Sequence, residues 1–247
     1  MKVDEKSSPS AREEFFRHVT REGIQRDLRH RNIASLNRII EANEENMTVV
    51  YEMEYCTGPE LSVYLRRHRV LEEKEAKLII KQVLAAVCYL SNLKERIIHY
   101  DLKPSNIIFD RGEIKILDFG LCKIMPESDE TRIELTSQGV GTYWYLPPET
   151  FDKYDPRISE KVDVWSVGVI FFEMLYGRRP FGHGMTQTQI YDKGVMLRAY
   201  KVEFPSEHSR KHKVSDGAKE FIKECLRDNY MDRLSPIQAY EHPYLKK

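Results

Sequence analysis

Apolar residues recur along the chain at helical spacing in several places. Steps of three and four residues predict an amphipathic helix over residues 73–93. Residues 159–176 are almost wholly apolar, which is typical of a helix at the centre of a larger helical region. Shorter helices are expected at residues 218–226 and 237–240, and a less regular one over residues 12–28.

Other segments have the pattern of strands or of loops. Residues 36–42 and 48–53 predict two short strands joined by a polar turn, and residues 114–117 predict a third strand after a turn. Residues 121–140 are polar and without periodicity, so a loop is expected there. Helices and short strands together predict an α+β protein.

Composition excludes several kinds of partner. Thirty-nine basic residues balance thirty-nine acidic ones, so charge gives no reason to expect direct binding to nucleic acid or to a membrane. No apolar run approaches the length that spans a bilayer. The four cysteines lie far apart and form no zinc-ligand pattern, so reduced thiols and an intracellular location are expected.

The stretch over residues 97–120 gathers chemically reactive side chains. It contains Asp101, Lys103 and Asn106, then a turn, a short strand and Asp118. Phosphoryl transfer needs hard oxygen ligands for Mg²⁺, a cation near the phosphate and a carboxylate near the attacking hydroxyl. Asn106 and Asp118 can supply the ligands, Lys103 the cation and Asp101 the proton acceptor. A solvated surface turn is the simpler alternative for such charged residues.

At these residues the chain resembles the protein kinase family, whose catalytic loop reads HRDLKxxN and whose metal loop reads DFG. The resemblance implies a two-lobed fold with a small β-rich lobe and a large, mainly helical lobe. It also implies ATP and Mg²⁺ as cofactors, with Lys103 in the pattern of serine/threonine kinases. His99 is interpreted as a buried scaffold residue, because a carboxylate already fills the role of base.

The same resemblance identifies residues 53–61 as the hinge between the lobes. It implies that Met53 lies beside the adenine pocket, that backbone groups of Glu54 and Cys56 bind the adenine, and that Glu60 meets the ribose. An ordinary strand followed by a turn would give the same local sequence. The position upstream of the catalytic loop favours the hinge.

Residues 121–149 correspond by resemblance to the activation segment. Thr142 is expected to bridge Asp101 and Lys103. The family's DxWSxG motif implies that Asp163 accepts hydrogen bonds from backbone N–H groups of the catalytic loop. The segment's Tyr-Trp-Tyr-Leu residues are expected to contact the substrate next to its hydroxyl.

Two further positions follow from the resemblance. Glu149, in a Pro-Pro-Glu motif where most of the family has Ala-Pro-Glu, is expected to pair with Arg233. Tyr100 stands where most family members have an arginine that binds a phosphate on the activation segment. A tyrosine cannot make that charge-assisted contact, so phosphorylation at Thr136 or Ser137 would need another cation to order the segment.

The motifs HYDLKP and LTSQGVGTYWYLPPE together are similar to the Tousled-like kinases. This resemblance runs over about residues 13–245 and implies a nuclear serine/threonine kinase. The implied substrates are hydroxyl-bearing chromatin-assembly proteins such as the histone chaperone Asf1. Tousled-like kinases oligomerise through coiled coils, and this chain contains no coiled-coil pattern.

The first fifty residues depart from the family. They contain a single glycine, so no glycine-rich loop precedes the hinge, and a partly truncated small lobe is expected over residues 1–55, followed by a helical lobe over residues 56–247. Lys2 is a candidate for the phosphate-binding lysine, against the alternative of a plain charged terminus, and Glu22 is its candidate partner. The chain is therefore either an active kinase domain or a catalytically weak, kinase-like binding module.

Overall fold

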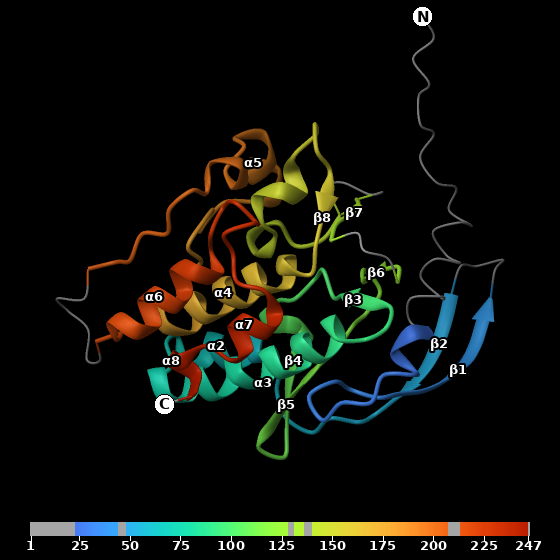
Figure 1. Ribbon diagram of the computed structural model, residues 1–247. Helices are drawn as coiled ribbons and strands as arrows, with labels where there is room; N and C mark the ends of the chain where they lie inside the picture. Colours follow the sequence, from blue (N-terminus) through green and yellow to red (C-terminus); the bar gives the residue numbers. More distant parts are fainter. Residues whose placement is uncertain (1–22, 44–47, 128–130, 136–139, 207–212, 247) are drawn as a thin grey trace, which may run out of the picture.

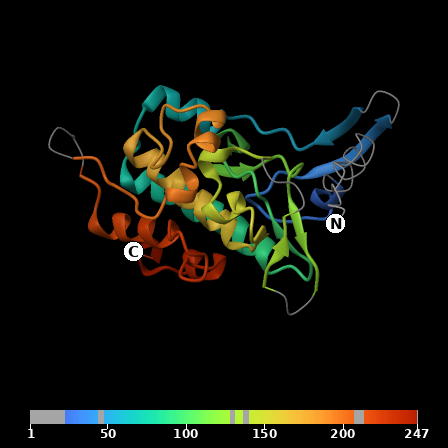
Figure 2. The ribbon, with the colours of Figure 1, turned by 90° about the horizontal axis from the view of Figure 1, so that it is seen from above.

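The computed structural model describes residues 23–43, 48–127, 131–135, 140–206 and 213–246. A helical body forms most of the molecule, and a hairpin of two strands extends from one side of it (Figures 1 and 2). Helices and small antiparallel sheets occur together, so the predicted α+β class is confirmed. No helix within these ranges combines the length and apolar character that crossing a bilayer requires.

Helices α3 (Glu73–Ser91) and α4 (Lys161–Tyr176) pack together in the middle of the body. Every residue of α4 from Val162 to Tyr176 is buried except Glu173. Gly168 allows the close approach of α6 (Asp216–Cys225), because a Cβ atom there would lie 2.7 Å from the Cβ of Cys225. Shorter helices complete the described part of the body: α2 (Leu61–His68), α5 (Gln187–Asp192), α7 (Pro236–Tyr240) and α8 (Pro243–Lys246).

Within the described part of the chain, the strands pair as four antiparallel, two-stranded sheets. The projecting hairpin consists of β1 (Leu36–Asn43) and β2 (Thr48–Met53), as predicted. A second hairpin, β4 (Ile107–Asp110) with β5 (Glu113–Ile116), lies against α3. Its two-residue turn places Arg111 and Gly112 at φ values of 49° and 86°, the pairing of positive φ angles that tight hairpins favour.

The loop predicted over residues 121–140 is wrong in part. Strand β6 (Lys123–Met125) pairs with β3 (Arg96–Ile98), and β7 (Ile133–Glu134) pairs with β8 (Arg157–Ile158). Strands of two and three residues are too short to show an alternating pattern, so only their distant partners define them. The segment is thereby tied to the body at two places.

The end of the first predicted helix also needs correction. Most of residues 12–28 lies outside the described part, and the described helical residues end at Gln25 rather than Leu28. Beyond that point the amides of Arg26, Asp27 and Leu28 bond to carbonyls three residues earlier. The last turn is therefore tightened, as is common at helix ends, where the final carbonyls lack the usual partners four residues later.

Candidate active site

The β4–β5 hairpin frames the candidate site. The loop before β4 carries Asp101, Lys103 and Asn106. Asp118 lies two residues after β5 ends at Ile116. The Leu117 N–H donates to the Asn106 carbonyl at 2.9 Å, which closes the open end of the hairpin. Side chains separated by twelve residues are thus held on one short, rigid unit.

Asp101 lies at the centre of a small polar cluster and is 6% exposed. The Thr142 hydroxyl donates to its Oδ1 at 2.8 Å, and the Lys103 ammonium donates to its Oδ2 at 2.5 Å. Lys103 also donates to the Thr142 hydroxyl at 3.0 Å. The predicted bridge from Thr142 to both residues is therefore confirmed, and it fixes the orientation of the carboxylate.

Asn106 is bound through the nitrogen end of its carboxamide. Its Nδ2 donates to the Asp101 carbonyl at 2.9 Å and more weakly to Asp101 Oδ2 at 3.3 Å. Both contacts direct the amide nitrogen toward Asp101. The amide oxygen, a ligand type that Mg²⁺ accepts, is left for a group outside this cluster.

Asp118 has a backbone conformation that few non-glycine residues adopt, with φ at 61°. Its Oδ1 accepts the Gly120 N–H at 3.2 Å, while the side chain remains open to solvent. Phe119 is buried against the edge of the His99 ring, with centroids 4.8 Å apart. The buried phenylalanine anchors a strained turn that presents the Asp118 carboxylate outward, and such strain is concentrated at functional sites.

Asp163, in the first turn of α4, positions the start of the catalytic loop. Its two carboxylate oxygens accept the N–H groups of His99 at 2.7 Å and Tyr100 at 2.9 Å, which confirms the predicted contact. Burial raises the pKa of the Asp163 carboxyl, and the two N–H donors act against that rise. His99 is buried, and its Nε2 lies 2.9 Å from the Leu117 carbonyl, as expected of a scaffold residue.

Tyr100 takes part in apolar packing. It is buried with φ at 71°, in a cluster with Met125, Leu135 and Leu146. The Lys123 ammonium lies 5.0 Å from the centre of its ring. The sequence indicated that Tyr100 lacks the charge for an arginine-type contact with phosphate, but it did not reveal that the ring packs against residues of the following segment.

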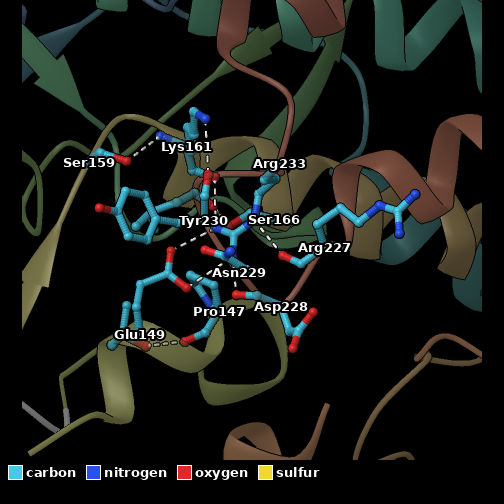
Figure 3. A network of polar contacts seen from close by, with 12 residues as sticks. Pro147, Glu149, Ser159, Lys161, Ser166, Arg227, Asp228, Asn229, Tyr230 and Arg233 are labelled. Atoms are coloured by element: carbon cyan, nitrogen blue, oxygen red, sulfur yellow. Dashed lines mark hydrogen bonds and ion pairs between the residues drawn. The ribbon is translucent and has the colours of Figure 1, made fainter. Parts of the chain in front are cut away.

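The Glu149–Arg233 pair is buried and fully hydrogen bonded (Figure 3). The guanidinium donates to both carboxylate oxygens, at 2.7 and 2.9 Å, as predicted. Its remaining N–H groups reach the carbonyls of Arg227, Lys161 and Asp228. The pair joins the segment after Thr142 to the start of α4 and to the loop that follows α6.

The predicted hinge begins where β2 ends at Met53. The Glu54 N–H already donates to the Ser35 carbonyl at 2.9 Å, so its own carbonyl is the group left for a ligand. Its carboxylate accepts from Lys115 at 2.8 Å. Burial acts to raise the pKa of this carboxyl, but hydrogen bonds from Lys115 and Ser35 outweigh burial and lower it.

The other two predicted nucleotide contacts within the described residues do not line the same cavity, since Glu60 borders one that Cys56 does not. Cys56 is half-buried, and burial raises the pKa of its thiol. Glu60 accepts the Ser62 hydroxyl at 2.8 Å and lines a cavity of about 710 Å³ together with Lys103 and Thr142. Lys2 and Glu22 lie outside the described residues.

The comparisons with known proteins agree with this geometry. The protein kinase domain family matches residues 1–245, so the chain belongs to the protein kinase family. The mouse serine/threonine-protein kinase tousled-like 2 is 46% identical over 244 residues, which cover 95% of this chain and 33% of that protein. Arabidopsis thaliana TOUSLED is 43% identical over 242 residues, 96% of this chain and 34% of that protein.

These similarities confirm the predicted resemblance to the Tousled-like kinases. Human tousled-like 1 is likewise 46% identical over 243 residues, covering 95% of this chain and 31% of that protein. The chain thus spans about a third of the length of the curated relatives that it matches.

Proposed function

We propose that this chain is the catalytic domain of a serine/threonine protein kinase, which transfers the γ-phosphoryl group of ATP to protein hydroxyls with the help of Mg²⁺. The observation that carries this proposal is the orientation of the Asp101 carboxylate, which Thr142 and Lys103 hold beside Asn106. Asp118 follows the hairpin that begins just after Asn106. Family membership supports the same reaction.

The residues present fit a magnesium ion shared with phosphates. Mg²⁺ prefers oxygen ligands and is commonly held by one or two side chains together with substrate phosphates. Asp118 offers an open carboxylate, and Asn106 offers the amide oxygen that its contacts with Asp101 leave free for a ligand. When bound, the ion would neutralise charge on the phosphates.

Each group around Asp101 has a distinct role in this proposal. Asp101 accepts the proton of the substrate hydroxyl, because its carboxylate is fixed in place by Thr142 and Lys103, which both line the cavity. Lys103 balances the charge of Asp101 and supplies a cation beside the transferred group. Thr142 holds both in register through its hydroxyl.

The nucleotide is proposed to bind between the hairpin and the body. Met53 would border the adenine, the Glu54 carbonyl and backbone groups of Cys56 would bind its edge, and Glu60 would meet the ribose. Support comes from the Glu54 carbonyl, to which no backbone N–H of the described residues donates. Lys2 and Glu22 are proposed as the phosphate-binding lysine and its partner.

The biological setting is proposed from the similarity to Tousled-like kinases. Residues 1–55 would form the small lobe and residues 56–247 the hinge and large lobe. We expect substrates to be Ser/Thr-bearing proteins, with histone chaperones of the Asf1 type as the first to test, and we expect a nuclear location. The names of the relatives support serine/threonine specificity.

The test is phosphorylation of an Asf1-type chaperone with labelled ATP and Mg²⁺. Asp118→Asn should lower the rate by about a hundredfold or more, since electrostatic groups at a transferring phosphate contribute that much. Asp192→Asn, which removes an equal charge from the exposed end of α5, is the matched control and should leave the rate unchanged. Equal rates for the parent and Asp118→Asn would contradict the metal assignment.

A second measurement separates a kinase from a binding module that does not use nucleotide. Mg·ATP at a hundredfold excess over its Kd should stabilise the chain by about 2.7 kcal/mol in a thermal unfolding experiment. No shift at millimolar nucleotide, together with no phosphate transfer, would favour the binding module.

A further inference from the structure

The cavity beside the catalytic loop has an uneven distribution of charge. It measures about 710 Å³ and is bordered by Lys103 and Thr142, the two residues that hold the Asp101 carboxylate. A polypeptide bound in this cavity would therefore lie beside the two residues that hold the Asp101 carboxylate. Its charged lining comprises four cations and two carboxylates, although the whole chain has thirty-nine of each sign: Arg66, Arg69, Lys103, Arg179, Glu60 and Glu173.

The two carboxylates are poorly placed to bind a basic substrate near Arg66 and Arg69. Glu173 accepts the Tyr145 hydroxyl at 2.6 Å and lies 3.8 Å from the Arg179 guanidinium. Glu60 precedes α2, whereas Arg69 follows it, so the two are separated by about 13 Å of helix. Glu60 therefore belongs to the opposite end of α2 from Arg69, and its carboxylate accepts the Ser62 hydroxyl at 2.8 Å.

Arg66 and Arg69 are exposed cations of a different kind. Within the described residues, neither has a carboxylate within 4 Å, so both are available to a ligand. Arg66 lies in the last turn of α2, whose buried residues Leu61 and Leu65 fix its other face, and Arg69 directly follows the helix. Both side chains line the same cavity.

The backbone that carries Arg69 is firmly held. Arg69 has φ at 63° and ψ at −55°, and the Val70 N–H donates to the His68 carbonyl at 2.8 Å, which defines a rare and strained γ-turn. Gly177, at the end of α4, lies under this turn, and a Cβ atom there would come within 2.9 Å of the Arg69 carbonyl. Arg69 is thus attached to the rigid helical body.

Arg179 completes the cationic wall. Its guanidinium stacks 4.1 Å from the centre of the Trp144 ring and remains 29% exposed. Trp144 follows Thr142 by two residues, so this cation lies next to the group that orients Asp101. Three guanidinium groups therefore border one side of the path to the carboxylate.

We propose that Arg66, Arg69 and Arg179 select protein substrates that carry anionic side chains close to the phosphorylated serine or threonine. This inference rests on the proposed kinase function and adds the substrate class to it. Arginine binds carboxylates and phosphates through paired N–H groups, so acidic residues and previously phosphorylated residues share the required chemistry. Basic side chains near the acceptor would be repelled.

The experiment compares serine peptides that differ only beside the acceptor. Aspartates at each neighbouring position are replaced by asparagines in one series and by phosphoserines in another. We expect kcat/KM to favour aspartate over asparagine by about three- to tenfold, mostly through KM, because half-exposed charge pairs each contribute modestly. Raising the salt concentration to 0.5 M should reduce the preference.

Variants at the end of α2 identify the residues responsible. Arg66→Glu should abolish the preference for aspartate, and the milder Arg66→Gln and Arg69→Gln should reduce it. Arg67→Glu is the matched control, because Arg67 is exposed in the same turn but does not line the cavity. It should retain the full preference, and an equal loss in Arg67→Glu would overturn the assignment to the cavity.

The outcomes distinguish this inference from the function on which it rests. Efficient phosphorylation of aspartate and asparagine peptides alike would refute the acidic preference and leave the kinase function intact. No ATP-dependent phosphorylation of any peptide would refute the kinase function, and peptide binding measured by fluorescence anisotropy would still test the charge preference. A phosphoserine peptide preferred more than tenfold over aspartate would identify previously phosphorylated proteins as the source of the anion.

Discussion

The helical body and the β1–β2 hairpin each contain an arginine–carboxylate pair with the same 2.7 Å contact, in opposite surroundings. Arg233 and Glu149 are 0% and 9% exposed, whereas Arg38 and Glu52 are 69% and 43% exposed. Water competes for the second pair and is excluded from the first. Equal distances therefore do not mean equal contributions, and burial decides which pair the fold depends on.

The same contrast applies to the two regions as a whole. The loop that carries Asp101 is braced by α4 through Asp163, and α4 is buried over almost its whole length. In the hairpin, by contrast, five of the eight residues of β1 and two of the six residues of β2 face solvent. The groups proposed for chemistry thus lie on the body, and the hairpin supplies the edge against which a nucleotide is proposed to bind.

The largest expected effect comes from breaking the buried pair. Arg233→Ala should lower the free energy of unfolding by about 3–5 kcal/mol, because it leaves the Glu149 carboxylate buried without its partner. Urea denaturation followed by circular dichroism measures the change. Arg227→Ala is a suitable control, since Arg227 contributes only its carbonyl to the network and its side chain is exposed. Similar midpoints for the parent and Arg233→Ala would show that the network is dispensable.

A smaller effect is expected from His30, which connects the segment before β1 to α3. Its ring stacks on Tyr89 at 5.1 Å, and its Nδ1 accepts the Asn32 N–H at 3.1 Å. Burial, with the nearby charges of Arg31 and Lys115, lowers the pKa of His30 below 6.5. The unfolded chain then binds the proton more readily, so stability is retained above pH 6.5 and declines as the pH falls below it.

Thermal unfolding at pH 7.5 and 5.5 tests this linkage. The parent should lose more stability over that interval than His30→Gln, which cannot titrate. If His30→Gln and the parent respond identically to pH, the linkage to His30 is wrong.

The smallest effect is expected from the hairpin pair. Arg38→Ala should shift the urea midpoint by no more than the error of measurement, because many exposed ion pairs contribute nothing measurable. Comparing it with Arg233→Ala in one series tests the contrast between the two regions directly. A loss in Arg38→Ala comparable to that in Arg233→Ala would mean that the hairpin is as strongly coupled as the body.

Local sequence was sufficient for the parts of the molecule with a clear repeat or a dense motif. The helix α3, the buried α4 and the loop from Asp101 to Asn106 lie close to where the sequence placed them. The bridge at Thr142 and the pair Glu149–Arg233 were predicted from the family resemblance. Spacing alone does not bring residues 84 positions apart together.

Other features depend on contacts that no local pattern encodes. Helix α2 buries only Leu61 and Leu65, and the residue before it, Glu60, makes no side-chain capping bond, so neither its periodicity nor its start is evident in the sequence. Strands β6 and β7 exist because distant segments pair with them. The γ-turn at Arg69 likewise follows from the packing of Gly177 beneath it.

Tyr100 has a consequence for how the segment after Phe119 responds to its surroundings. The attraction between a phosphate and an arginine is electrostatic, and it weakens as the salt concentration rises. The cluster of Tyr100 with Met125, Leu135 and Leu146 is held by burial of apolar surface, which salt does not screen and which weakens on cooling. The order of this segment should therefore follow temperature more closely than ionic strength.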